Sequence, residues 1–183
     1  MGYDYWDFNK FIAEAESAFD KHQSKATLLL DAPTEDRYIK YLPVYSPEKA
    51  YKHFIKNQKT GKPDGWLEVP IIEGDYLETQ YVVQVKGNSL LPLYDADSWL
   101  ILNYTSDYSL AANNICLVHH KSIIDNYEAN YTIRKLEVSQ FTPPGTLLPV
   151  TNILLHDLTG TQSPISIFGA NELTDISIIG ILI

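Results

Sequence analysis

A serine stands in a turn directly after an apolar segment. Residues 81–85 predict a buried strand, and Gly87, Asn88 and Ser89 follow it. A turn of this kind can expose a serine hydroxyl beside free backbone N–H groups. The hydroxyl becomes nucleophilic only next to a base, and the N–H groups would stabilise an oxyanion. Three residues alone are more typical of an ordinary turn than of a catalytic one.

The longer segment from Val85 to Ile101 is more specific. After the strand it contains, in this order, Gly87, Ser89, Pro92, Asp95 and Asp97, and then the apolar residues 99–102. This order resembles the signature of LexA-like self-cleaving repressors, UmuD-like proteins and phage repressors, in which the serine is the nucleophile. Asn88, Leu90 and Ala96 stand where that family usually has aspartate, methionine and glycine. The resemblance implies that Gly87, Asn88 and Leu90 surround the nucleophile and its oxyanion site.

Four other segments resemble the family in the same order along the chain. Residues 43–46 resemble the segment before the cleavage loop, and residues 65–70 resemble the strand before the signature. Residues 131–136 resemble the strand that carries the lysine base, and residues 176–181 resemble the closing strand. The resemblance therefore covers residues 42–183. It implies a mainly β, LexA-like or signal-peptidase-like domain of short strands with Ser–Lys peptidase chemistry.

The base departs from the family pattern. An uncharged lysine takes the serine proton in the family, and burial must lower its pKa for that purpose. Arg134 is in register with that lysine, and Lys135 follows one place later. Arginine stays protonated in proteins, so Arg134 cannot be a general base. Neighbouring strand residues face opposite ways, so Lys135 would need a β-bulge to reach Ser89. Alternatively, Arg134 makes a hydrogen bond or ion pair near Ser89 in a degenerate site.

The cleavage segment departs as well. The family cuts after alanine, at an Ala-Gly pair, whereas the aligned bond here is Tyr51-Lys52 and the nearest bond with an alanine is Ala50-Tyr51. We therefore expect self-cleavage to be weakened or absent.

Other residue types offer little further chemistry. His119 and His120 are adjacent, so on a strand they would face opposite ways, and no Cys or His spacing resembles a zinc site. We expect no metal and no cofactor. The single cysteine, Cys116, lies in an apolar run and is interpreted as a buried hydrophobic residue. Asp95 and Asp97 are interpreted as turn residues.

The composition sets limits on the partners. Hydrophobic residues make up 45% and charged residues 20%, which predicts a folded core. The net charge of -9 argues against direct nucleic-acid binding, because the phosphate backbone is repelled. One cysteine fits a reducing cytoplasm, and no segment has the ~20 apolar residues of a membrane helix. We expect a cytoplasmic protein without membrane contact.

The elements that position these residues divide the chain at residue 41. Apolar side chains at helical spacing over residues 5–22 predict one amphipathic helix within an N-terminal extension, 1–41. Residues 42–183 predict the β-rich domain. Pro43 is expected on an edge strand, and the lysine-rich residues 46–64 are expected to form a solvated loop.

The favoured function is a regulatory module with weakened or lost autoproteolysis. UmuD-like proteins lack a DNA-binding domain and dimerise, so the resemblance implies a homodimer and a protein partner. The Ile-rich strand at 176–183 is the expected dimer edge. One alternative is an active Ser–Lys peptidase that cleaves itself or a partner. Another is a β-rich interaction domain of a larger regulator, in which Ser89 has no role.

Overall fold

The computed structural model describes residues 27–56, 58, 62–70, 75–86, 90, 93–124, 130–145, 147–158, 160, 163–168, 173 and 175–183. The helix predicted over residues 5–22 and the predicted turn at 87–89 lie outside these ranges. Within them, no helix is both long enough and apolar enough to span a membrane.

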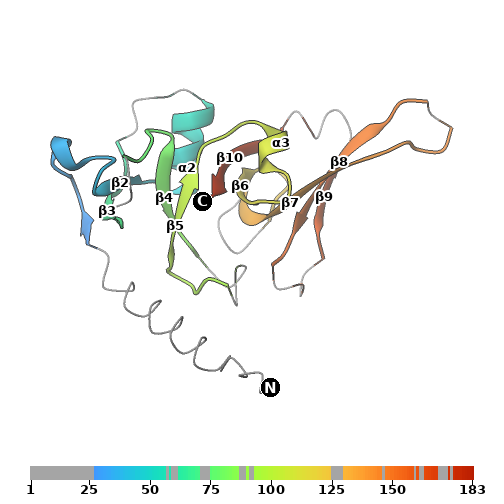
Figure 1. Cartoon of the computed structure of the whole chain (residues 1–183). Helices are drawn as coiled ribbons and strands as arrows, with labels where there is room; N and C mark the ends of the chain where they lie inside the picture. Colours follow the sequence, from blue (N-terminus) through green and yellow to red (C-terminus); the bar gives the residue numbers. More distant parts are fainter. Residues whose placement is uncertain are drawn as a thin grey trace, which may run out of the picture.

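The described chain is mainly β, as predicted. Its ten strands form one sheet in the order β1-β3-β2-β4-β5-β10-β6-β7-β8-β9 (Figure 1). All neighbours are antiparallel except β2 and β4. The strands are β1 (Leu28–Leu29), β2 (Tyr41–Val44), β3 (Gly65–Glu68), β4 (Gln80–Gln84), β5 (Trp99–Asn103), β6 (Ile115–His119), β7 (Tyr131–Phe141), β8 (Val150–His156), β9 (Ile165–Phe168) and β10 (Ser177–Leu182).

The C-terminal strand β10 lies in the middle of the sheet, between β5 and β6. The prediction that residues 176–183 form a dimer edge is therefore wrong. Both faces of β10 are buried: Ile179 packs in one core cluster with Tyr81 and Ile133, whereas Ile178 packs in another with Leu136. Its strongly apolar sequence reflects this two-sided burial. Among the described strands, the two edges of the sheet are β1 and β9.

Pro43 does not lie on an edge strand, since β2 pairs with both β3 and β4. Proline is tolerated because pairing between β2 and β4 is limited to Val44 and Val82, and the first bond comes from the Tyr45 N–H to the Val82 carbonyl. Residues two apart in a strand direct their N–H groups to the same side, so an N–H at Pro43 would also have pointed towards the β4 side of β2. Pairing with β4 begins only after Pro43, so the N–H that proline lacks is not needed for it.

The segment expected as a solvated loop begins with a folded helical stretch. The α-helix α2 (Pro47–Ala50) continues into a π-helical turn, η2 (Tyr51–Ile55). Ala50 is fully buried, and the half-buried Tyr51, Phe54 and Ile55 pack against the core cluster that contains Tyr81 and Ile179. Two other short helices, η1 (Thr34–Asp36) and α3 (Tyr108–Ala111), connect strands.

The long hairpin of β7 and β8 extends past the sheet. Its outer part projects away from the rest of the molecule as an arm (Figure 1). The pairing runs in one register from Lys135 opposite His156 to Phe141 opposite Val150. We call residues 138–151 of this hairpin the arm.

Candidate functional site

The described structure gives the two flanks of the predicted nucleophile turn. Val85, directly after β4, is fully buried and exchanges backbone hydrogen bonds with Asp97 and Ser98. Leu90 is also fully buried, and its carbonyl accepts the N–H groups of Leu93 and Tyr94. Gly87, Asn88 and Ser89 lie between these two anchors, outside the described residues. The position of Ser89 therefore stays a prediction.

The acidic residues after Leu90 form a turn. The Ser98 N–H donates to the Asp95 carbonyl, and Asp97 has a φ of 70°. Aspartate tolerates this left-handed region better than most residues. This backbone role agrees with the interpretation of Asp95 and Asp97 as turn residues.

The side chains of Arg134 and Lys135 face opposite sides of β7. Arg134 is 3% exposed and its Nε lies 3.3 Å from the Thr132 hydroxyl oxygen, to which it donates, whereas Lys135 is exposed to solvent. The pairing of β7 with β6 keeps a constant register through both residues, and the pairing with β8 begins at Lys135 and also keeps one register. The β-bulge that would turn Lys135 to the other face is therefore absent from β7.

The candidate cleavage residues Ala50, Tyr51 and Lys52 lie in the α2–η2 helical stretch. Tyr51 stacks on the imidazole of His119, with ring centroids 4.2 Å apart. The Tyr51 carbonyl accepts a hydrogen bond from the Lys56 N–H at 3.2 Å. Both candidate bonds are therefore part of a folded helix whose inner face is anchored to the core.

The sequence carries signals for this helix that the loop prediction left unused. Pro47 stands at the first helical position and Glu48 in the first turn, which are both typical of a helix start. The apolar residues 50, 51, 54 and 55 then recur at helical spacing. The lysines between these apolar residues led to the prediction of a solvated loop.

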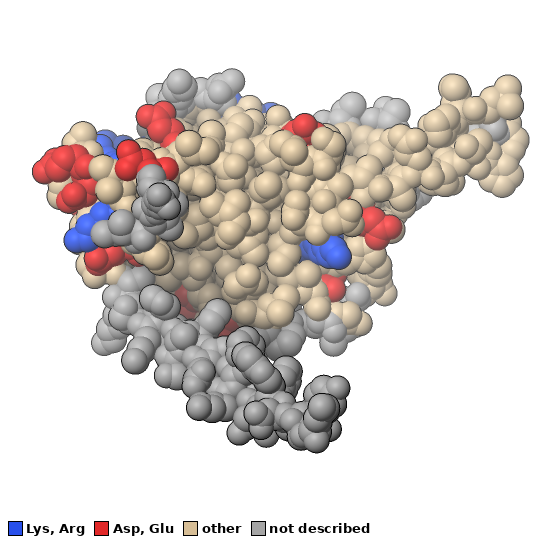
Figure 2. All heavy atoms as spheres, in the orientation of Figure 1, with Lys and Arg blue, Asp and Glu red and all other residues tan. Residues whose placement is uncertain are grey.

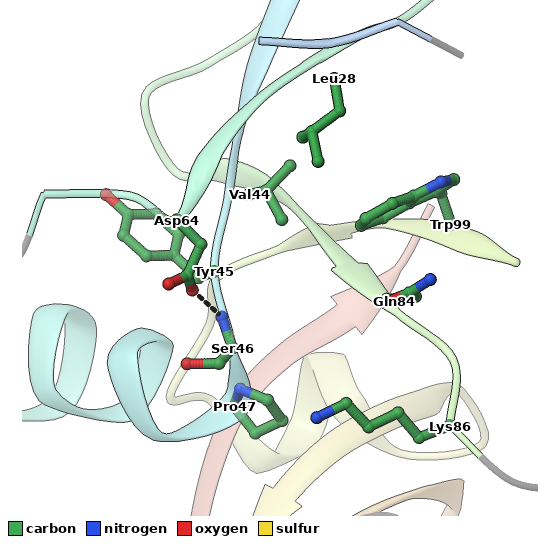
Figure 3. Close-up of a pocket in the computed structure, with 9 residues that line it drawn as sticks. All are labelled: Leu28, Val44, Tyr45, Ser46, Pro47, Asp64, Gln84, Lys86 and Trp99. Carbon is green, nitrogen blue, oxygen red and sulfur yellow. Dashed lines mark hydrogen bonds between the residues drawn. The ribbon is translucent and has the colours of Figure 1, made fainter. Parts of the chain in front are cut away.

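A pocket of about 200 Å³ opens beside α2 and the last described residue before the turn (Figure 3). Sequence reasoning did not find it, because its walls come from five separate segments. Apolar side chains form most of the wall, and Gln84, Lys86 and Asp64 add polar groups. The lining residues are Leu28, Val44, Tyr45, Ser46, Pro47, Asp64, Gln84, Lys86 and Trp99.

Asp64 ties this pocket to the start of α2. Its carboxylate accepts the Ser46 N–H at 2.7 Å and pairs with the Lys49 ammonium at 2.5 Å (Figure 3 shows the first bond). Burial acts to raise the pKa of Asp64, but the hydrogen bonds from Lys49 and Ser46 outweigh it and hold the pKa below 3.8. Asp64 is therefore a charged structural anchor at neutral pH and not a proton donor.

Two further side chains with reactive atoms, Cys116 and His120, lie in the interior. Burial raises the pKa of the Cys116 thiol to about 12, so the reactive thiolate is not formed near neutral pH. His120 is fully buried, and its Nδ1 lies 2.7 Å from the Ser122 hydroxyl. Among the residues that the structure describes, no three His, Cys, Asp or Glu side chains gather as metal ligands.

The stacked His119 predicts a dependence of stability on pH. Burial lowers its pKa below 6.5, and the neighbouring His120 and Lys56 lower it further. The unfolded chain then binds the proton more readily than the folded chain. Stability is fully present above pH 6.5 and falls as the pH drops through the folded pKa. We expect His119→Phe, which keeps a ring on Tyr51, to reduce the loss of unfolding free energy between pH 7.5 and 5.5 in urea titrations. An unchanged loss would contradict this role.

Comparison of the chain with protein-family models, with curated proteins and with solved structures gives no match. The LexA-like resemblance therefore depends on the order of the residues in this chain alone.

Proposed function

We propose that the chain is a LexA-like peptidase-fold module that has lost self-cleavage and regulates a protein partner as a homodimer in the cytoplasm. Transcription, stress responses or mobile elements are the processes that this class of module serves. The ordered motif from Gly87 to Asp97 and the mainly β fold of residues 42–183 support this proposal.

The observation that carries the proposal is the helical state of residues 50–52. A serine nucleophile must approach the carbonyl of a peptide bond that lies open in its cleft. The Tyr51 carbonyl is instead occupied by the Lys56 N–H, and the Ala50 side chain is fully buried. Presenting either bond would break the Tyr51–His119 stack and expose Ala50, so the folded segment opposes its own cleavage.

The strand that should supply the base supports the same conclusion. Arg134 occupies the register position of the family lysine, and its guanidinium stays charged. Lys135 is exposed on the opposite face of an unbulged strand. Its ammonium therefore lies in solvent, on the side of β7 away from the buried Arg134.

Incubation at alkaline pH tests this proposal, because high pH deprotonates a lysine base. We expect the wild type, Ser89→Ala and Lys135→Ala all to keep the intact mass of the chain for days at about pH 10, near the pKa of lysine. Cleavage of the wild type near residues 50–52, with both variants intact, would overturn the proposal in favour of an active Ser–Lys peptidase.

A fluorophosphonate probe tests the nucleophile independently of the cleavage segment. It forms a covalent adduct with activated serines, which intact mass detects. We expect the wild type to be labelled no more than Ser89→Ala. A Ser89-dependent adduct in an uncleaved chain would overturn the loss of the base while leaving the blocked cleavage segment in place.

A further inference from the structure

The outer edge of β9 is open in the described structure. β9 pairs with β8 along residues 165–168, and no described strand pairs with its other side. In an antiparallel pair every second residue directs its N–H and C=O away from the neighbour, so two residues of β9 present backbone groups that no described strand pairs. Natural edge strands are usually protected by charged side chains, proline or bulges. β9 has a constant register with β8, and its sequence, Ile-Ser-Ile-Phe, has neither charge nor proline.

The surface around this edge is almost free of charge. From Val138 to Asn171 the sequence contains one charged residue, Asp157, and that residue is buried. The face of the arm visible in Figure 2 accordingly shows no Lys, Arg, Asp or Glu. A surface designed to stay soluble and monomeric carries roughly 25–35% charged residues. The absence of charge is therefore a specific property of the outer part of β7 from Val138 onward, of β8 and β9, and of the connections between them.

The net charge favours a second copy as the occupant of this surface. Two chains of net charge -9 repel each other, and the repulsion is least where the facing surfaces are uncharged. A basic partner or a nucleic acid would instead be recognised by a charged surface. An uncharged edge strand whose outer hydrogen-bonding groups face no described strand can pair with the same edge strand of a second chain.

We propose that β9 pairs antiparallel with β9 of a second copy across a two-fold axis. Antiparallel pairing lets the same residues on both strands exchange hydrogen bonds, as a two-fold interface requires. The β9 strand is then the surface through which the homodimer of the proposed function forms. This inference rests on the homodimer in that proposal.

In this arrangement the arm of each chain contacts the other chain. Phe168 lies opposite Asn152 and Ile165 opposite Leu155, so the tip of the arm extends beyond the Phe168 end of β9. In an antiparallel pair this end meets the Ile165 end of the partner strand. Each arm then runs along the other copy, where its tip residues Leu147 and Leu148, 98% and 76% exposed in one chain, gain a surface to cover.

Sedimentation equilibrium over about 1–100 µM, the range of moderate affinities, tests the interface. We expect the wild type to sediment with twice the mass of one chain. Ser166→Lys places like charges on the two facing edges, and the double variant Leu147→Glu, Leu148→Glu charges both tips. Each should raise the dimer dissociation constant at least about tenfold. Both sites are exposed, and circular dichroism checks that the variants stay folded.

Leu30→Glu is the matched control, because Leu30 is 92% exposed and adjoins the opposite edge strand β1. It should leave the dissociation constant unchanged. A dimer that only Leu30→Glu weakens, or that none of these variants weakens, would overturn the β9 interface and leave the proposed function standing. A wild type that stays monomeric would overturn the interface and the homodimer together. Self-cleavage in the alkaline assay would instead overturn the loss of peptidase activity alone.

Discussion

Leu90→Ala should lower the free energy of unfolding by about 2–5 kcal/mol, the range for large-to-small changes at fully buried sites. Leu90 is fully buried in the core cluster that contains Tyr45, Val85 and Ile133, and its backbone carbonyl accepts two hydrogen bonds from the turn that follows. Truncation removes apolar contacts and leaves a cavity that this surrounded site cannot fill.

Two variants show whether burial causes the loss. Leu90→Met keeps a similar apolar volume and should cost less than about 1.5 kcal/mol. Leu93→Ala removes the same atoms from a side chain that is 57% exposed and should stay within about 0.5 kcal/mol of the wild type. Urea unfolding monitored by fluorescence gives all three values. A Leu90→Ala loss as small as that of Leu93→Ala would show that Leu90 is not a core anchor.

The strands were predictable because their signals are local. Apolar runs bounded by turn residues indicated β3 to β6, β9 and β10 close to their observed bounds, but only residues 131–136 of β7 and no part of β8. The opposite faces of Arg134 and Lys135 followed from the two-residue period of a strand once the register was known. These properties depend on a few neighbouring residues and can be predicted without knowledge of the tertiary structure.

The order of the strands was not predictable in the same way. The Ile-rich sequence of β10 indicates burial, but both an apolar dimer edge and a central position satisfy that pattern. Pairing with β5 and β6 joins residues far apart in the chain, which no local pattern encodes. The pocket at Lys86 and Asp64 escaped prediction for the same reason, since several separate segments form it.

Gly180→Ala should destabilise the centre of the sheet by about 1–3 kcal/mol, the usual cost of adding an atom to a packed core. A Cβ at this position would lie 2.7 Å from the Tyr81 hydroxyl oxygen and 3.2 Å from the Asn103 carbonyl oxygen. The Tyr81 ring is fully buried against Phe54, with ring centroids 4.8 Å apart, and its hydroxyl donates to the Ile179 carbonyl at 3.1 Å. The ring therefore has little space into which it can retreat.

A double-mutant cycle with Tyr81→Phe identifies the cause. Tyr81→Phe removes the hydroxyl and its hydrogen bond, at a cost of about 1–3 kcal/mol where the carbonyl stays buried. In that background the closest contact of the new methyl group at position 180 no longer exists. The double variant should therefore be less destabilised than the sum of the single variants, by about 0.5 kcal/mol or more. Strict additivity in urea unfolding would show that the neighbouring backbone, and not Tyr81, excludes a side chain from the middle of β10.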